Sequence, residues 1–423
     1  MPPIHGRGES TARRHVLAGA DLPLMVLSDS ATSHNIQIMA KFCADNRVEL
    51  APHAKTHMSR QLCRRQLEAG AWGMTAATTS QVRTLSGFGV TRILHANQLV
   101  DPAAIAWVAA TYLTGGDAQY YCYVDSLAGL ALLERELDRI NPPAKLRVLI
   151  ELGFVGGRTG IRSDPDAVTL AHAVAGSARV DLAGVAGFEG LMPASDGETP
   201  WGAAEFLRRM RALTKYCADA GLFAGTPVVT AGGSSFFDLV VAELGPDSWD
   251  FPVTCVLRSG CYVTHDHGLY ARTSPFGART WPFGFRGAAV GEHFVPALEL
   301  FASVLSRPEP DRVIVGFGRR EAPTDDRMPI VLGRLRAVEG AGDTGRDTDG
   351  DTDGDTDGDT DGWEVTAVND HHAFLRVPAD AVVDPGQILR FGISHPCGAF
   401  DRWRSIPLID DERHVLGVIR PVL

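Results

Sequence analysis

The stretch that decides the fold is Pro52-His53-Ala54-Lys55-Thr56-His57, a short polar segment with one lysine. It follows the apolar-ended run 47–50, and the pattern after it predicts a helix over 58–70 and a strand over 73–77. Strand, loop with a lysine, helix and strand is the layout of a β/α barrel, whose reactive groups sit at the carboxyl ends of the strands. A lysine there can form a Schiff base with a carbonyl cofactor, whereas an isolated loop lysine is usually a solvated surface residue. The rest of the chain decides between the two.

The strand-then-helix pattern repeats roughly eight times from residue 23 onward. The predicted strands are 23–27, 47–50, 73–77, 92–96, 119–124, 146–152, 182–188, 227–231 and 254–258. The predicted helices are 31–45, 58–70, 79–87, 102–113, 126–139, 166–176, 203–220 and 237–244, the first of them capped by Ser30. Near-continuous apolar strands such as 146–152 are typical of a parallel sheet buried on both faces. We therefore predict a TIM-type (β/α)8 barrel over 23–280, after a lead-in over 1–22.

Short strands separated by turn residues follow the barrel and predict a mostly antiparallel β domain over 281–423. They are 295–304, 312–316, 330–338, 363–368, 373–377, 388–391 and 414–419. An acidic low-complexity insert, 343–362, holds the repeat Asp-Thr-Asp-Gly. Its composition is that of a calcium loop, but it lacks the glutamate at the twelfth position and flanking helices. We interpret it as a solvated hairpin extension.

Composition and charge describe an ordinary globular chain of 423 residues, 45% of them apolar. The formal net charge is −11, and the nine Asp and one Arg of the insert account for −8 of it, which leaves −3 elsewhere. No basic patch points to nucleic acid, and no run approaches the length of a membrane span. Seven cysteines without a CxxC pair, in a chain without a signal-peptide core, predict reduced thiols and a cytoplasmic location.

Two glycine-containing segments carry candidate anion-binding groups. Thr230-Ala231-Gly232-Gly233-Ser234-Ser235 lies between a predicted strand and helix, where backbone amides and the helix N-terminus can hold a phosphate. The alternative is a plain turn with a serine cap. The loop 258–262 could add an amide and a phenol. Arg158 follows another apolar strand and could face the barrel mouth, although a lone arginine is more often a surface cation.

His395-Pro396-Cys397 is a candidate metal site near the end of the β domain. Alternate side chains of an extended segment point the same way, so the histidine and cysteine can reach one ion. Imidazole with thiolate favours zinc, and manganese or magnesium are the alternatives. Two ligands fall short of the usual count, so His371 or His372 could supply a third, and a purely structural role for the pair stays open.

In this order the segments resemble the fold-type III pyridoxal-phosphate (PLP) enzymes with an alanine-racemase-like barrel, within them the D-serine dehydratase and D-threonine aldolase branch. The residues that carry the resemblance are 52–57, Ala96-Asn97-Gln98, Arg158-Thr159-Gly160, Gly232-Gly233-Ser234, Gly260-Cys261-Tyr262 and His395-Pro396-Cys397. Two positions depart from the branch. Phe188 stands where a tyrosine is expected near the cofactor, and the segment 316–320 lacks an expected aspartate.

The resemblance implies roles for these residues. Lys55 would carry PLP, and the phosphate would be held by Gly232, Gly233, Ser234, Gly260 and Tyr262. Arg158 would face the pyridine nitrogen, and His395 with Cys397 would bind a divalent metal beside the substrate.

The resemblance also implies a lyase acting on a D-3-hydroxy amino acid, with family members commonly dimeric. Cys397, rather than an aspartate, favours a D-serine dehydratase that yields a 2-oxo acid and ammonia. The alternatives are a D-threonine aldolase that yields glycine and an aldehyde, a racemase, which needs no metal, and a PLP-carrier barrel without catalysis. The presence of a whole β domain argues against the carrier.

Overall fold

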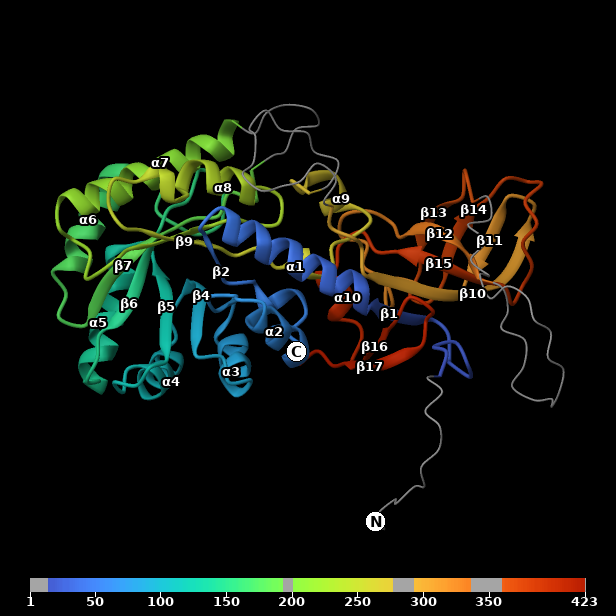
Figure 1. Cartoon of the computed structure of the whole chain (residues 1–423), viewed down its shortest axis with the longest axis horizontal. Coiled ribbons are helices and arrows are strands. Elements are labelled where there is room, and N and C mark those ends of the chain that lie inside the picture. Colours follow the sequence, from blue (N-terminus) through green and yellow to red (C-terminus); the bar gives the residue numbers. More distant parts are fainter. Residues whose placement is uncertain (1–13, 193–200, 277–292, 336–359, 423) are drawn as a thin grey trace, which may run out of the picture.

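The chain forms two β-sheets, a parallel eight-stranded barrel and a mostly antiparallel nine-stranded sheet, which lie side by side in Figure 1. The structure is a computed structural model that describes residues 14–192, 201–276, 293–335 and 360–422. No helix within these residues has the length and apolarity to cross a membrane.

The barrel strands run in the order β2-β9-β8-β7-β6-β5-β4-β3, and every pair is parallel. A bridge from His53 to Thr75 joins the two ends of this order and closes the barrel. The strands are β2 (Glu49–Leu50), β3 (Met74–Ala76), β4 (Arg92–Gln98), β5 (Gln119–Val124), β6 (Leu146–Glu151), β7 (Val180–Ala186), β8 (Val228–Ala231) and β9 (Thr254–Leu257). The predicted (β/α)8 barrel is confirmed.

Helices cover the outside of the barrel. They are α1 (Asp29–Asp45), α2 (Arg60–Glu68), α3 (Thr79–Gly87), α4 (Pro102–Tyr112), α5 (Leu127–Ile140), α6 (Asp164–Ala175), α7 (Trp201–Asp219) and α8 (Phe237–Leu244). Several begin at a side-chain cap: Ser59, Thr78 and Ser126 accept hydrogen bonds from the first turns of α2, α3 and α5. Each such cap is worth about 1 kcal/mol. The caps therefore fix where each helix starts relative to the strand before it.

Alternation along the strands divides the barrel core into two layers. On β5, Tyr121 and Tyr123 pack inside the barrel with Leu149 of β6. The neighbouring residues, Cys122 on β5 and Val148 on β6, point the other way and face the helices. All five are buried. Both faces of the sheet are therefore apolar, which is why the strands read as nearly continuous apolar runs.

The second sheet follows the order β13-β14-β11-β10-β1-β16-β17, with β15 pairing both β10 and β12. Its strands are β1 (Leu24–Ser28), β10 (Leu298–Glu309), β11 (Arg312–Val315), β12 (Ile330–Leu335), β13 (Glu364–Val368), β14 (Ala373–Arg376), β15 (Ile388–Gly392), β16 (Ile406–Ile409) and β17 (Val415–Ile419). Within this sheet, only the β1–β16 pair is parallel among the described strands. Phe317 and Phe391 pack their rings 4.6 Å apart in the core of this sheet.

The first predicted barrel strand, 23–27, forms but belongs to the other sheet. As β1 it pairs antiparallel with β10, Leu24 opposite Phe301, and parallel with β16, Leu27 opposite Leu408. Its central residues are completely buried, so its composition fits either sheet. The helix after it is capped by Ser28, whose hydroxyl accepts from the Ala31 amide at 3.2 Å, and not by Ser30 as predicted.

The connections around the second sheet differ in part from prediction. Most of the acidic insert lies outside the described residues, as does the predicted boundary at 280. The insert joins β12 to β13, and in the described part of the chain β12 pairs with β15 and β13 with β14 rather than with each other. Strand β16 is absent from the prediction.

Candidate active site

Lys55 lies in a one-turn 3-10 helix, η1 (Ala54–Thr56), directly after β2. Its neighbours Ala54 and Thr56 are buried, and Lys55 itself is exposed. His57 anchors the end of the turn: its Nε2 donates to Gln66 at 3.1 Å, and its Nδ1 accepts from the Ser59 amide at 3.0 Å. The lysine is therefore the one side chain that this rigid turn presents to open space.

A cavity of about 230 Å³ opens at the carboxyl ends of the barrel strands, and Lys55 lines it. Its walls include Lys55, Arg158, Gly232, Gly233, Ser234 and Gly260. Tyr262 is not among them. It is buried beside α2, where its phenol accepts from the Gln66 amide at 2.9 Å. Tyr270 of α9 (Leu269–Thr273) lines the cavity instead. The structure thus brings together all the predicted cofactor residues except the Tyr262 side chain.

The amides of Gly232 and Gly233 hold an anion in this structure, the carboxylate of Glu189. Gly232 N donates to one carboxylate oxygen at 3.1 Å and Gly233 N to the other at 2.8 Å. Glu189 is fully buried. A Cβ at position 233 would lie 3.0 Å from the Phe188 ring, so the backbone approaches its neighbours closely here. The donor pair that precedes α8 is therefore suited to anions, and a phosphate would meet these amides or those that follow them.

Two guanidinium groups reach the cavity in different ways. Arg258 is buried, with its two terminal nitrogens donating to the Thr230 hydroxyl at 2.8 Å and the Gly187 carbonyl at 2.6 Å. Arg158 is exposed and lies 4.8 Å from the centre of the Phe188 ring. Phe188, the first departure from the branch, therefore supports Arg158 through a cation–π contact. Arg258 is fixed in place, whereas Arg158 is free to adjust.

Buried polar groups face the same cavity. Glu151 accepts from Gln98 and from Thr159, and burial raises the pKa of its carboxyl group, although these bonds and the Arg258 charge oppose the shift. The His53 Nδ1 and the Tyr123 hydroxyl are buried without a partner within the described residues. Unpaired polar atoms of this kind are costly in a folded chain. They are the expected surroundings of a polar ligand, so the donor set fits a polar aromatic cofactor such as PLP.

Three metal-ligand side chains meet beside this cavity. Cys261 of η3 (Cys261–Val263), His395 and Cys397 of α10 (Cys397–Phe400) place one donor atom each within 4.8 Å of one another. The two sulfurs are 3.4 Å apart, and each lies 3.6 Å from the Thr56 hydroxyl. Because Thr56 follows Lys55, the metal-ligand cluster and the lysine turn are in contact.

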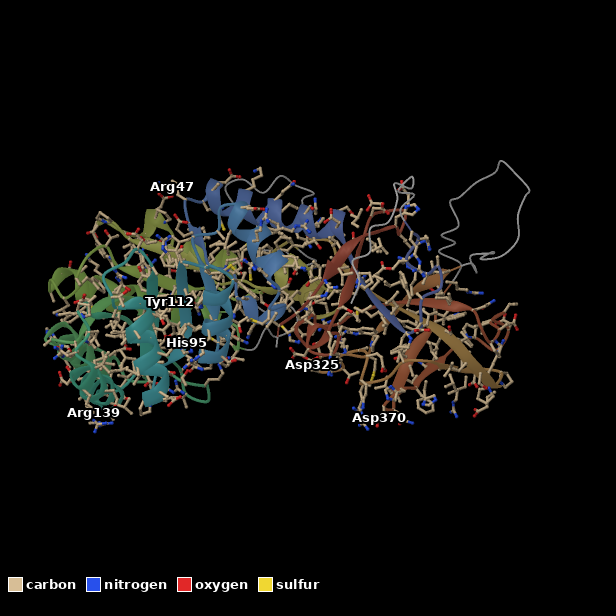
Figure 2. All side chains as sticks on the ribbon, turned by 90° about the horizontal axis from the view of Figure 1, so that it is seen from below. Arg47, His95, Tyr112, Arg139, Asp325 and Asp370 are labelled. Carbon is tan, nitrogen blue, oxygen red and sulfur yellow. The ribbon has the colours of Figure 1, made fainter. Side chains whose placement is uncertain are left out.

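His395 also contacts a carboxylate outside the cluster. Its Nδ1 bonds to Asp325, which Figure 2 shows between the barrel and the antiparallel sheet. Burial alone would lower the pKa of His395, but Cys397 and Asp325 outweigh it and raise the pKa to about 9. Bonds from Cys261 and His395 hold the pKa of Cys397 well below its usual range. Both shifts favour the charged forms of the two side chains, and a thiolate is the form in which a cysteine binds a metal.

The histidines predicted as a third ligand are not in this cluster. His371 and His372 are both exposed, and His371 Nδ1 bonds to Glu321 at 2.8 Å. The third member of the cluster is Cys261 instead. Its position just after strand β9 is the sequence feature that could have indicated it. Asp325, which orients His395, stands five residues beyond the segment 316–320 in which the branch aspartate is missing.

The same folding pattern is found in known proteins. The family model "Alanine racemase, N-terminal domain" matches residues 27–241, a little over half of the chain. The chain belongs to the alanine racemase-like family of fold-type III PLP enzymes. A second model, "Putative serine dehydratase domain", matches residues 297–409. Lys55, Arg158 and the glycine segment lie in the first match, and His395 and Cys397 in the second.

Relatives of this family cover nearly the whole chain. A D-threonine aldolase from Arthrobacter sp. is 26% identical over 97% of this chain and 93% of its own. The crystal structure of D-threonine aldolase from Filomicrobium marinum superposes with a TM-score of 0.76 at 23% identity, over 97% of this chain and 98% of its own. D-threo-3-hydroxyaspartate dehydratase from Delftia sp. HT23 superposes with a TM-score of 0.69 at 22% identity, over 97% of this chain and 99% of its own.

Two mutant forms of a D-threo-3-hydroxyaspartate dehydratase also share the fold. One replaces a histidine by alanine, and one replaces a cysteine two residues later and is metal-free.

Proposed function

We propose that the protein is a PLP- and zinc-dependent lyase that eliminates the β-hydroxyl of a D-3-hydroxy amino acid, of the D-serine dehydratase type. The observation that carries the proposal is the contact between the Lys55 turn and the Cys261, His395 and Cys397 cluster through Thr56. A cofactor held at Lys55 and a metal held by the cluster would act on neighbouring atoms of one substrate.

The residues that would hold PLP are those around the cavity. Lys55 would bind it through its ε-amine, and the segment 232–234 with Gly260 would surround its phosphate. When bound, PLP supplies electron withdrawal that weakens the bonds at the substrate α-carbon. Arg158 or the buried Arg258 would face the ring nitrogen, and a guanidinium there keeps that nitrogen unprotonated because two cations repel.

The residues that would hold the metal are His395 and Cys397. Imidazole and thiolate donors favour zinc over the hard cations. A metal there supplies a Lewis acid for the substrate β-oxygen. Asp325 accepts from His395 Nδ1 and leaves Nε2 as the ring nitrogen that can bind the ion.

Proton transfer belongs to the lysine. Once its amine is released by the incoming amino acid, Lys55 Nζ can take the proton from the α-carbon, and the turn that carries it is held on both sides by buried neighbours. The amino acid thereby loses its α-proton and its β-hydroxyl, which together make one water molecule, and a metal at the cluster would supply the Lewis acid that helps the hydroxyl leave. Water hydrolyses the product to a 2-oxo acid and ammonia.

A second candidate is aldol cleavage to glycine and an aldehyde, as in D-threonine aldolase. The full-length likeness to D-threonine aldolases favours it. The same lysine and metal would serve. The proton of the β-hydroxyl would be removed, the bond between the α- and β-carbons would break to release the aldehyde, and a proton would be returned to the α-carbon to give glycine. Sulfur ligands favour the dehydratase, since resemblance within the branch associates a His–Cys pair with elimination and a His–Asp pair with aldol cleavage.

The deciding experiment is incubation of the PLP-loaded protein with D-serine, D-threonine and D-3-hydroxyaspartate, with and without a chelator. A 2-oxo acid with ammonia, lost on chelation and restored by zinc, is the expected result. Glycine with an aldehyde would establish the aldolase instead. Turnover of none of these substrates with PLP bound would contradict both reactions and leave the carrier interpretation.

A further inference from the structure

The side chain of Cys261 has the position of a metal ligand. Its sulfur lies 3.4 Å from the Cys397 sulfur, and its donor atom lies within 4.8 Å of that of His395. In a tetrahedral zinc site, with zinc–sulfur bonds of about 2.3 Å and zinc–nitrogen bonds of about 2.0 Å, two sulfurs lie roughly 3.8 Å apart and sulfur and nitrogen roughly 3.6 Å. The three donors are therefore within about an ångström of that arrangement before any ion is added.

We propose that Cys261 is a third protein ligand, so that the metal centre is a Cys₂His site specific for zinc, with one coordination position left for the substrate oxygen. The inference rests on the metal role proposed above for His395 and Cys397. Three protein ligands with one open position is the arrangement of catalytic zinc sites, whereas two would leave the ion largely to water and substrate.

The surroundings of Cys261 support ligation over a packing role. Its sulfur meets the Cys397 sulfur and the Thr56 hydroxyl, and the side chain also lines the cavity. The other buried cysteines of the barrel lie among apolar side chains in its core. Cys261 thus stands where its sulfur can reach an ion and the substrate space.

Two consequences follow from a second thiolate. Soft sulfur donors disfavour magnesium and calcium and strengthen the preference for zinc over manganese. The ligands also come from both parts of the molecule, because Cys261 follows barrel strand β9 while His395 and Cys397 follow strand β15 of the antiparallel sheet. The ion would therefore tie the two sheets together at the cavity.

The direct test counts sulfur ligands in the intact enzyme. X-ray absorption of the zinc-loaded full-length protein is expected to show two sulfur neighbours at about 2.3 Å. One sulfur would overturn the proposal. This measurement needs no variant and no activity.

Variants give the second test. Cys261→Ala is compared with Cys255→Ala, which removes a buried thiol from β9 away from the cavity. We expect Cys261→Ala to weaken zinc binding by at least about 100-fold, since even outer-shell changes cost about 10- to 100-fold. The thiolate-to-metal absorption of the cobalt-substituted protein should fall by about half in the same variant, while Cys255→Ala leaves both unchanged. Unchanged zinc affinity and absorption in Cys261→Ala would refute the ligand assignment.

Two controls separate this inference from the proposed function. Loss of zinc in Cys397→Ala but not in Cys261→Ala overturns only the third ligand. Failure of the wild-type chain to bind zinc or cobalt overturns the metal role as a whole. Thiol titration of the metal-free, unfolded protein is expected to find all seven cysteines free. Two fewer free thiols would mean a disulfide, and its assignment to Cys261 and Cys397 by peptide mapping would contradict a pair of ligating thiolates.

Discussion

Gly260→Ala tests how closely the loop after β9 approaches the lysine turn. A Cβ at position 260 would lie 2.5 Å from the His53 carbonyl oxygen and 2.9 Å from the Thr56 hydroxyl, and these two residues flank the segment Ala54-Lys55. Real Cβ atoms stay beyond 3.0 Å, so one loop must move by at least half an ångström. A backbone oxygen cannot rotate away as a side chain can.

The expected magnitude follows from that displacement. Overpacking of this kind costs about 1–3 kcal/mol of stability. A misplacement of about 1 Å near the reacting atoms can cost about 100-fold in rate, so we expect kcat to fall roughly 10-fold or more for half that shift. The measurements are thermal unfolding, PLP absorbance and kcat on the substrate identified above. Gly87→Ala, at the end of α3 with nothing within 4 Å of its added Cβ, is the matched control. A Gly260→Ala enzyme with unchanged kcat and stability would refute the reasoning.

Three further predictions address single groups. Lys55→Ala should lose the visible absorbance of lysine-bound PLP while the fold survives, because Lys55 is exposed in its turn; a persistent band would refute the lysine assignment. Cys397→Ala should lose zinc and elimination but keep the cofactor band, and zinc content equal to wild type would contradict the metal role. Burial raises the pKa of Asp266 to about 7 in the folded protein, above its value in the unfolded chain. Ionising this buried carboxyl group therefore lowers the stability of the fold as the pH rises from about 4 to 7. Asp266→Asn keeps the acceptor that caps α9, so its stability relative to wild type should increase over that pH range, and a pH-independent difference in unfolding free energy would contradict this.

Local pattern was enough to place many elements of the fold. The predicted ranges of α3 and α8 and of strand β5 coincide with the structure, because their boundaries are set by adjacent caps, glycines and apolar alternation. The sheet to which β1 belongs could not be predicted, because it depends on partner strands that begin only at residues 298 and 406, and because β1 is apolar on both faces. The absence of β16 from the prediction has a similar reason, since Pro407 interrupts a very short strand.

The candidate site shows the same division between local and long-range information. The sequence placed Lys55 and Gly232 at strand ends, and strand ends meet at one rim of a parallel barrel. The sequence does not show in which direction a loop side chain points. Tyr262 was therefore expected at the cavity, whereas Tyr270 lines it. The Glu189 carboxylate on the glycine amides was also unpredicted, because that contact depends on three-dimensional packing between β7 and β8.

The position of β1 has a consequence for how the chain is made. This strand is synthesised before the barrel, whereas its partners in β10 and β16 are synthesised after the barrel. Until then Met25, Val26 and Leu27 have no sheet to join, and the barrel can close without them. The antiparallel domain is thus completed only when segments that precede and follow the barrel in the sequence come together, with the whole barrel inserted between them. A fragment that begins at β10 would lack a strand from the middle of its sheet, so the two domains should not be separable by simple truncation.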